Sequence, residues 1–238
     1  MSKYFKKYKN FNYTKPFKST KKNKDNILVI GDIHAPFTHK EYLQFCRHQQ
    51  ELFNCGTVIF IGDLADFHYS SFHNTDPDGL SAGDEAEEAA LQLEEWYQMF
   101  PNAIVTVGNH DLILYRKMFA TGLSRRYART WNELYHAPDT WQFVDKIVIN
   151  NIMYTHGTNN ALKRMKDSRI SVVQGHLHTI QYVQRSQSEV NNLFAMQVGC
   201  GIDDNAFAFA YNKSFNARPI IGCGVVLNKG TLPIVITH

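Results

Sequence analysis

The clearest indication of the fold is the segment Val58-Ile59-Phe60-Ile61-Gly62-Asp63-Leu64-Ala65-Asp66. Its four apolar residues indicate a buried strand, and the glycine and two carboxylates that follow indicate a turn. Four other apolar runs end similarly, at or beside a glycine and a residue able to bind a metal ion. They are residues 27–30 before Gly31-Asp32-Ile33-His34, 104–107 before Gly108-Asn109-His110-Asp111, 152–154 before Thr155-His156-Gly157, and 172–174 before Gly175-His176-Leu177-His178. The pattern places Asp63 at the centre of a two-metal site built from all five segments.

The bulk composition is that of a globular protein. The chain has 238 residues, of which 44% are hydrophobic and 20% charged, enough for one large domain. No apolar run approaches the roughly 20 residues that span a bilayer, and the N-terminus lacks the apolar segment of a secretory signal. We therefore expect a cytoplasmic protein without a membrane partner. In that compartment the four cysteines, which form no C-x-x-C pair, should be reduced and mostly buried.

The charge is distributed unevenly along the chain. Residues 1–24 hold nine lysines and no acid, so the remainder has 25 − 9 = 16 basic against 22 acidic residues. Six aromatic residues alternate with these lysines. They indicate either a tail that contacts phosphates and stacks its rings on bases, or an extension that packs its rings on the domain. We assign residues 1–25 to this basic, aromatic-interleaved extension and residues 26–238 to a single domain.

Strand and helix signals alternate from residue 26. Strands at 27–30, 57–61 and 103–107 are separated by helices that open at capping boxes, Thr38 to Glu41 and Ser81 to Asp84. This β-α-β-α-β order predicts parallel strands. A long loop at 67–80 and an irregular helical region at 111–140 interrupt the series. Short strand signals then follow closely, which predicts hairpins and a second, mixed sheet. They cover residues 142–144, 146–149, 152–154, 171–174, 180–184, 193–198, 220–227 and 232–236.

The candidate ligands all fall at strand ends. In open α/β sheets, functional groups gather outside the carboxyl ends of the strands, so segments far apart in sequence can meet. Asp32 and His34, like His176 and His178, are two residues apart and should point the same way in extended backbone. The preceding glycines should allow a tight turn. A mixed set of carboxylates, imidazoles and an amide suits divalent transition ions and lacks the thiolates of a closed zinc site.

These motifs, in this order, resemble the calcineurin-like metallophosphoesterases over about residues 26–180. The resemblance implies a four-layer α/β sandwich of two mixed β-sheets flanked by helices. It also implies two divalent metal ions, most naturally Mn²⁺, with iron, zinc, nickel and magnesium as alternatives. One metal would be held by Asp32, His34 and His178, the other by Asn109, His156 and His176, with Asp63 as the bridge. His110 would act on the substrate, and Asp66 would orient His110, so that Asp66→Asn should spare the metals.

The implied activity is hydrolysis of a phosphate ester by attack of a metal-bridging hydroxide. Phe67 stands where phosphoprotein phosphatases of this superfamily have Arg, and Asp111 where they have Glu, which argues against that branch. We expect a nucleotide or nucleic acid as substrate, for a phosphodiesterase, nuclease or phosphatase. Candidate substrate contacts are Arg116, Arg125, Arg126, His68 and His73, although arginines here also suit a solvated helix surface.

An alternative is a non-catalytic nucleic-acid-binding protein that uses the basic tail and keeps the metals as structural ions. The intact His110 and Asp66 argue against it, because a purely structural site needs neither. The sequence leaves the oligomeric state open.

Overall fold

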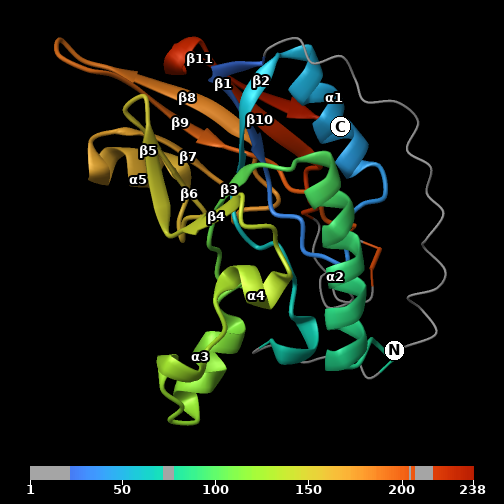
Figure 1. The fold of residues 1–238 in the computed structure, drawn as a ribbon. Coiled ribbons are helices and arrows are strands. Elements are labelled where there is room, and N and C mark those ends of the chain that lie inside the picture. Colours follow the sequence, from blue (N-terminus) through green and yellow to red (C-terminus); the bar gives the residue numbers. More distant parts are fainter. Residues whose placement is uncertain (1–21, 72–77, 204, 207–216) are drawn as a thin grey trace.

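In the part of the chain that the structure describes, the fold consists of two β-sheets and five α-helices (Figure 1). The computed structural model describes residues 22–71, 78–203, 205–206 and 217–238. The helices are α1 (Tyr42–Leu52), α2 (Ala82–Met99), α3 (Ile113–Ala120), α4 (Trp131–Tyr135) and α5 (Ala161–Ser168), with 3-10 turns η2 (His68–Ser70), η3 (Arg125–Tyr127) and η5 (Asn228–Gly230). The strands are β1 (Asn23–Ile30), β2 (Cys55–Phe60), β3 (Ala103–Thr106), β4 (Trp141–Val144), β5 (Lys146–Ile149), β6 (Ile152–Thr155), β7 (Ser171–Gln174), β8 (Tyr182–Gln187), β9 (Asn192–Gln197), β10 (Gly222–Leu227) and β11 (Leu232–Thr237).

The first sheet is six-stranded and mixed, in the order β11-β10-β1-β2-β3-β4. Strands β1 to β4 are parallel, which confirms the predicted β-α-β-α-β series, and β10 and β11 add antiparallel at the β1 edge. Of the later strands, from which we predicted a second, mixed sheet, β4, β10 and β11 belong to this first sheet. Strand β1 begins at Asn23, slightly before the domain boundary expected at residue 26.

The second sheet is five-stranded and also mixed, in the order β5-β6-β7-β9-β8. Strands β6, β7 and β9 are parallel, whereas β5 and β8 pair antiparallel at the two edges. Helix α5, which the sequence did not predict, packs Ala161 and Met165 onto β7 and β9. The two sheets with their flanking helices form the predicted α/β sandwich.

Alternate side chains of the central strands fill two different cores. Leu28 and Ile30 of β1 pack against α1 and α2, whereas Ile27 and Val29 face the second sheet. The same alternation holds along β2. Because both faces of these strands are buried, their sequences read as continuous apolar runs and not as alternating patterns. The carboxyl ends of the strands are thereby held in a fixed arrangement.

The N-termini of α1 and α2 differ from the predicted capping boxes. Ser81 caps α2 by accepting a hydrogen bond from the Asp84 backbone N–H, but Asp84 accepts from the Ser81 hydroxyl, so the predicted capping box is incomplete. No capping box forms at Thr38. The Thr38 hydroxyl instead donates to Ile33, and α1 begins after Glu41. All four cysteines are buried thiols outside any disulfide bond, as predicted. Within the described ranges, no helix is both long and apolar enough to pass through a lipid bilayer.

Candidate metal centre

Five strand ends bring the candidate ligands together. Strands β1, β2 and β3 of the first sheet end just before Asp32, Asp63 and Asn109, and β6 and β7 of the second sheet end just before His156 and His176. The backbone carbonyl of Asp63 accepts hydrogen bonds from the N–H groups of Ile33 and His34, so the turns after β1 and β2 are tied to each other. The centre therefore lies where the carboxyl ends of both sheets meet.

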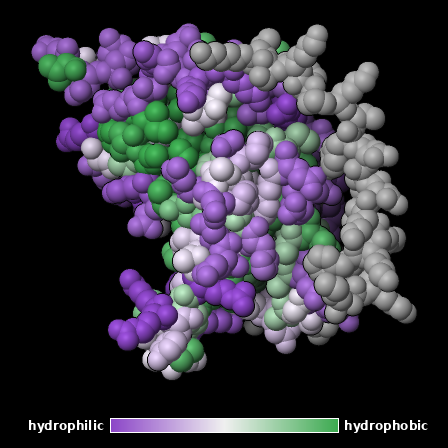
Figure 2. Space-filling view, in the orientation of Figure 1, coloured by the Kyte–Doolittle hydropathy of each residue, from purple (hydrophilic) through white to green (hydrophobic). Residues whose placement is uncertain are grey.

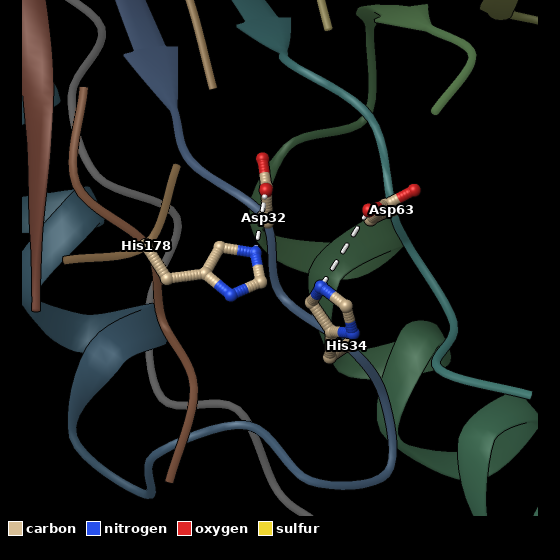
Figure 3. A group of neighbouring side chains, drawn as sticks. All are labelled: Asp32, His34, Asp63 and His178. Atoms are coloured by element: carbon tan, nitrogen blue, oxygen red, sulfur yellow. Dashed lines mark hydrogen bonds and ion pairs between the residues drawn. The ribbon is translucent and has the colours of Figure 1, made fainter. Parts of the chain in front are cut away.

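Four of the side chains form a compact group of potential ligands (Figure 3). The ligand atoms of Asp32, His34, Asp63 and His178 all lie within 4.8 Å of one another. His178 Nε2 is 2.9 Å from Asp32 Oδ2, and His34 Nε2 is 3.6 Å from Asp63 Oδ2. Asp32, His34 and Asp63 are almost completely buried, whereas His178 is partly exposed. The group is thus open to solvent on the His178 side.

A second set of donors meets the same Asp63 carboxylate. His156 Nε2 lies 3.3 Å from Asp63 Oδ2, 2.9 Å from Asn109 Oδ1 and 3.2 Å from His176 Nδ1. Asp63 Oδ2 therefore stands between His34 of the first set and His156 of the second. The other oxygen, Oδ1, accepts the backbone N–H of His110 at 2.8 Å. Of the two histidines in the G-H-x-H motif, His178 belongs to the first set and His176 to the second.

The backbone is bent at the residues that supply ligands. His34, Asp63 and His176 have φ values of 48°, 48° and 72°, in the left-handed region. Such conformations cost on the order of 1–3 kcal/mol each and persist where the surroundings impose them, often at functional sites. We expected the glycines before these residues, Gly31, Gly62 and Gly175, to provide the turns. Of these, only Gly62 has a positive φ. The turn itself is made by the ligand residues.

Two motif glycines instead leave space for carboxylates. A Cβ on Gly108 would lie 2.1 Å from Asp63 Oδ1, and one on Gly175 would lie 2.3 Å from Asp32 Oδ1. Any side chain at either position would displace an acid of the centre. Close approach, and not backbone freedom, therefore explains glycine at these two positions.

The sequence did not identify Asp111 as a structural part of the centre. Its carboxylate accepts hydrogen bonds from the backbone N–H groups of Asp63, Leu64 and Gly108, and from the Tyr135 hydroxyl at 2.5 Å. Burial and then the charge of Asp63 raise the pKa of Asp111 to about 6. Asp111 thus fixes the turns after β2 and β3 to each other. A carboxylate after Asn-His in the sequence gives no sign of these partners.

Replacing Asp111 with alanine should therefore destabilise the whole domain. Three backbone N–H groups and one hydroxyl would lose their buried acceptor, and we expect a loss of about 3 kcal/mol or more in the free energy of unfolding. Tyr135→Phe, which removes one of these donors, should cost about 1 kcal/mol. Urea denaturation measures both values. Equal stability of Asp111→Ala and the wild type would contradict this role.

Asp66 contacts two histidines, and the closer one is a candidate ligand. Its Oδ1 lies 2.5 Å from His34 Nδ1 but 3.4 Å from His110 Nδ1. The His110 ring is held mainly by the Asp66 backbone carbonyl, 2.6 Å from Nδ1. A carboxylate on the far nitrogen of a metal-binding imidazole orients the ring and raises its basicity. The sequence led us to expect that Asp66→Asn spares the metals. The contact between Asp66 and His34, a candidate ligand, leads to the opposite expectation.

Asp66→Asn should therefore weaken metal binding by about 10- to 100-fold, because the neutral amide supports His34 less well. Isothermal titration of the apo-protein with Mn²⁺ measures the affinity. The matched control is Glu85→Gln, another buried acid near the centre, which accepts hydrogen bonds from the backbone of His68 and Tyr69. Unchanged affinity in Asp66→Asn, together with slow turnover, would restore the first interpretation.

The electrostatics of the centre favour the ionised forms of the candidate ligands Asp32 and Asp63. Burial raises the pKa of Asp63, but the His156, His110 and His34 imidazoles outweigh it and hold the pKa below its ordinary value. The pKa of Asp32 is lowered in the same way, against the cost of burial, chiefly by His156. Burial lowers the pKa of His110, yet Asp63 and Asp66 raise it above its ordinary value overall. The imidazoles therefore keep Asp32 and Asp63 ionised, the form in which a carboxylate binds a metal ion.

The residues present fit divalent metal ions. Asp32 Oδ1 is buried and has no hydrogen-bond partner among the residues that the structure describes. Such an atom is costly unless a cation or water meets it. Bonds of about 2.1 Å to one ion place neighbouring ligand atoms roughly 3 Å apart, close to the separations around Asp63 Oδ2. The mixture of carboxylate, imidazole and amide donors is one that transition ions accept.

The other candidate residues lie outside this cluster or beyond the described residues. Arg116 lies on α3, and Arg125 and Arg126 lie on η3, all exposed. His68 is buried, with Nδ1 at 4.0 Å from Asp66 Oδ2. His73 and the basic residues 1–21 lie outside the described residues.

Comparisons with known proteins found a matching family and several similar solved structures. The model of the family described as calcineurin-like phosphoesterase matches residues 26–206. A metallophosphoesterase from Sphaerobacter thermophilus is similar in structure, at 11% identity and a TM-score of 0.47, covering 90% of this chain and 88% of that one. The phosphoesterase YfcE from E. coli (16%, TM-score 0.43) covers 85% and 88% of the two chains. Vacuolar Protein Sorting 29 from Cryptosporidium parvum (14%, TM-score 0.44) covers 90% and 96%. No curated protein matches the sequence.

Proposed function

The chain belongs to the calcineurin-like phosphoesterase family, and from this premise we propose that it is a dinuclear metal-dependent phosphoesterase. The observation that carries the proposal is the position of the Asp63 carboxylate. It lies between two sets of donors, with one oxygen facing both His34 and His156. A single carboxylate shared by two sets is what a bridging ligand requires.

The two sets divide the ligands between the two ions. Asp32, His34 and His178 would hold one, and Asn109, His156 and His176 the other, with Asp63 shared. When bound, the ions supply a water-derived nucleophile at neutral pH and neutralise the phosphoryl oxygens. Two of these ligands are held in place by hydrogen bonds: Asp66 contacts the His34 ring, and Asp111 accepts the backbone N–H of Asp63. Ligands held in this way would keep the ions, and a phosphate bound to them, in a fixed orientation.

His110 is the group best placed to protonate the leaving oxygen. Its side chain is 23% exposed, whereas that of His34 is fully buried, so a substrate can reach the His110 ring. The Asp66 carbonyl beside Nδ1 leaves Nε2 as the nitrogen that can face the substrate. A positioned imidazole of this kind is a typical general acid.

The finer substrate assignment is also part of the proposal. We favour a nucleotide or nucleic acid, handled by the domain at residues 26–238, with the basic residues 1–25 as an extension that adds affinity for phosphates. Mn²⁺ is the expected metal, and the expected location is the cytoplasm.

The test is a substrate panel with the purified chain. The metal-stripped protein, supplied with Mn²⁺, Zn²⁺ or Mg²⁺, is assayed on p-nitrophenyl phosphate, bis-p-nitrophenyl phosphate and a set of nucleotides. We expect hydrolysis that requires added metal and is lost again with a chelator. Failure on every substrate with every metal, despite metal binding, would favour the non-catalytic alternative.

A further inference from the structure

The chain leaves the metal centre through an exposed segment, residues 112–130, which we name the arm. It contains α3 and η3 and projects from the body of the molecule (Figure 1). Apart from Ile113, its described side chains are partly or fully exposed. Such a projection buries little apolar surface, so core packing does not account for its composition.

Both ends of the arm are fixed beside the candidate ligands. It starts directly after Asp111, whose neighbour His110 donates its backbone N–H to Asp63. It ends at α4, where Tyr135 donates to the same Asp111. The Tyr115 ring of the arm packs on Trp131, the first residue of α4, with centroids 4.5 Å apart. The arm therefore begins and ends beside the metal centre.

The arm is the basic part of an otherwise acidic domain. It holds five basic residues and no acid, namely Arg116, Lys117, Arg125, Arg126 and Arg129. Residues 25–238 contain 16 basic and 22 acidic residues, so outside the arm 16 − 5 = 11 basic residues face 22 acidic ones. A polyanion approaching the domain would therefore be attracted to the arm and repelled elsewhere.

Exposed rings accompany these charges. Tyr127 is 73% exposed and Phe119 is 46% exposed, and the Arg125 guanidinium lies 4.8 Å from the centre of the Phe119 ring. Leu123 is 49% exposed. Figure 2 shows hydrophobic and hydrophilic residues adjoining each other on this projection. Cations interleaved with open aromatic faces are the arrangement by which single-stranded nucleic acids are bound, through phosphates and stacked bases.

We propose that the arm is a docking surface for single-stranded nucleic acid, which guides a phosphodiester of the strand to the adjacent metal centre. The proposal rests on the proposed function for the cleavage step, but the docking itself does not depend on catalysis. Arg125 and Arg126 contact phosphates, and Tyr127 stacks on a base. A duplex, whose bases are already stacked, gains less from Tyr127.

The test is binding of a fluorescein-labelled single-stranded oligonucleotide to the full chain, followed by fluorescence anisotropy at several salt concentrations. Arg125→Ala/Arg126→Ala should weaken binding about tenfold at 0.1 M salt and lower the salt slope by about 1.4, because each lost phosphate contact contributes about 0.7. Tyr127→Ala should weaken binding by about five- to a hundredfold, whereas Tyr127→Phe, which keeps the ring, should bind like the wild type.

The control is Lys166→Ala/Arg169→Ala, which removes two exposed charges at α5 on the second sheet. It should leave the affinity unchanged, and residues 1–24 are common to all variants, so their contribution cancels. If the arm variants bind like this control, the proposal is wrong. Tighter binding of a duplex would overturn the assignment to single strands. Hydrolysis of bis-p-nitrophenyl phosphate by the wild type tests the proposed function separately, so either can fail alone.

Discussion

Replacing Asp63 with asparagine should abolish the paired metals and lower kcat/KM by at least about 10³-fold, or about 4 kcal/mol of transition-state stabilisation. The change removes one negative charge from the oxygen that faces both His34 and His156. With the amide oxygen on the His110 N–H, the group that faces both sets is an uncharged NH2, which cannot bind a cation. Metal content by mass spectrometry should fall below two ions per chain.

The asparagine variant should nevertheless fold. Asparagine tolerates the left-handed backbone that residue 63 adopts, and its carbonyl oxygen can still accept the His110 N–H. The matched control is Asp145→Asn, which removes an exposed acid. Full activity of Asp63→Asn with two ions bound would exclude the bridging role.

His110→Gln should slow turnover by about 10²- to 10⁴-fold on substrates with an alkoxide leaving group, while both metals stay bound. Loss of a proton donor matters most where the leaving oxygen is strongly basic. The loss should therefore be smaller with p-nitrophenyl esters, whose leaving group needs little protonation. Parallel kinetics on a nucleotide and on an aryl ester measure the difference.

His39→Gln is the control, because His39 lies outside the cluster. An equal loss of rate on both kinds of ester would show that His110 is not the proton donor. Loss of a metal ion in His110→Gln would make His110 a ligand or a support for one, and the assignment of its role would have to change.

The sequence predicted the candidate ligands because each follows a buried strand, and parallel strands bring such positions to one edge. It could not predict which histidine Asp66 contacts, because that depends on His34 adopting a left-handed backbone. It missed the structural role of Asp111, whose partners are backbone N–H groups that carry no sequence signature. We predicted that the motif glycines allow tight turns. At Gly108 and Gly175 the reason for glycine is different, because a carboxylate packs where a Cβ would lie.

The fold was predictable where pairing is between consecutive elements and less so where it is not. Strands β1, β2 and β3 follow each other through helices, so their parallel order follows from local signals. Strands β10 and β11 return from the end of the chain to the β1 edge, a choice that local patterns do not encode. Helix α5 escaped prediction because its buried positions are Ala161 and Met165 alone, too narrow a stripe to recognise.

In the proposed centre, one carboxylate, Asp63, is shared by two metal ions. A crystal grown with Mn²⁺ and measured for anomalous scattering tests it most directly. We predict two peaks roughly 3.5–4 Å apart, one near Asp32 and His178 and one near Asn109 and His176, with Asp63 in contact with both. A single peak, or two peaks of which only one contacts Asp63, would show that Asp63 does not bridge two ions.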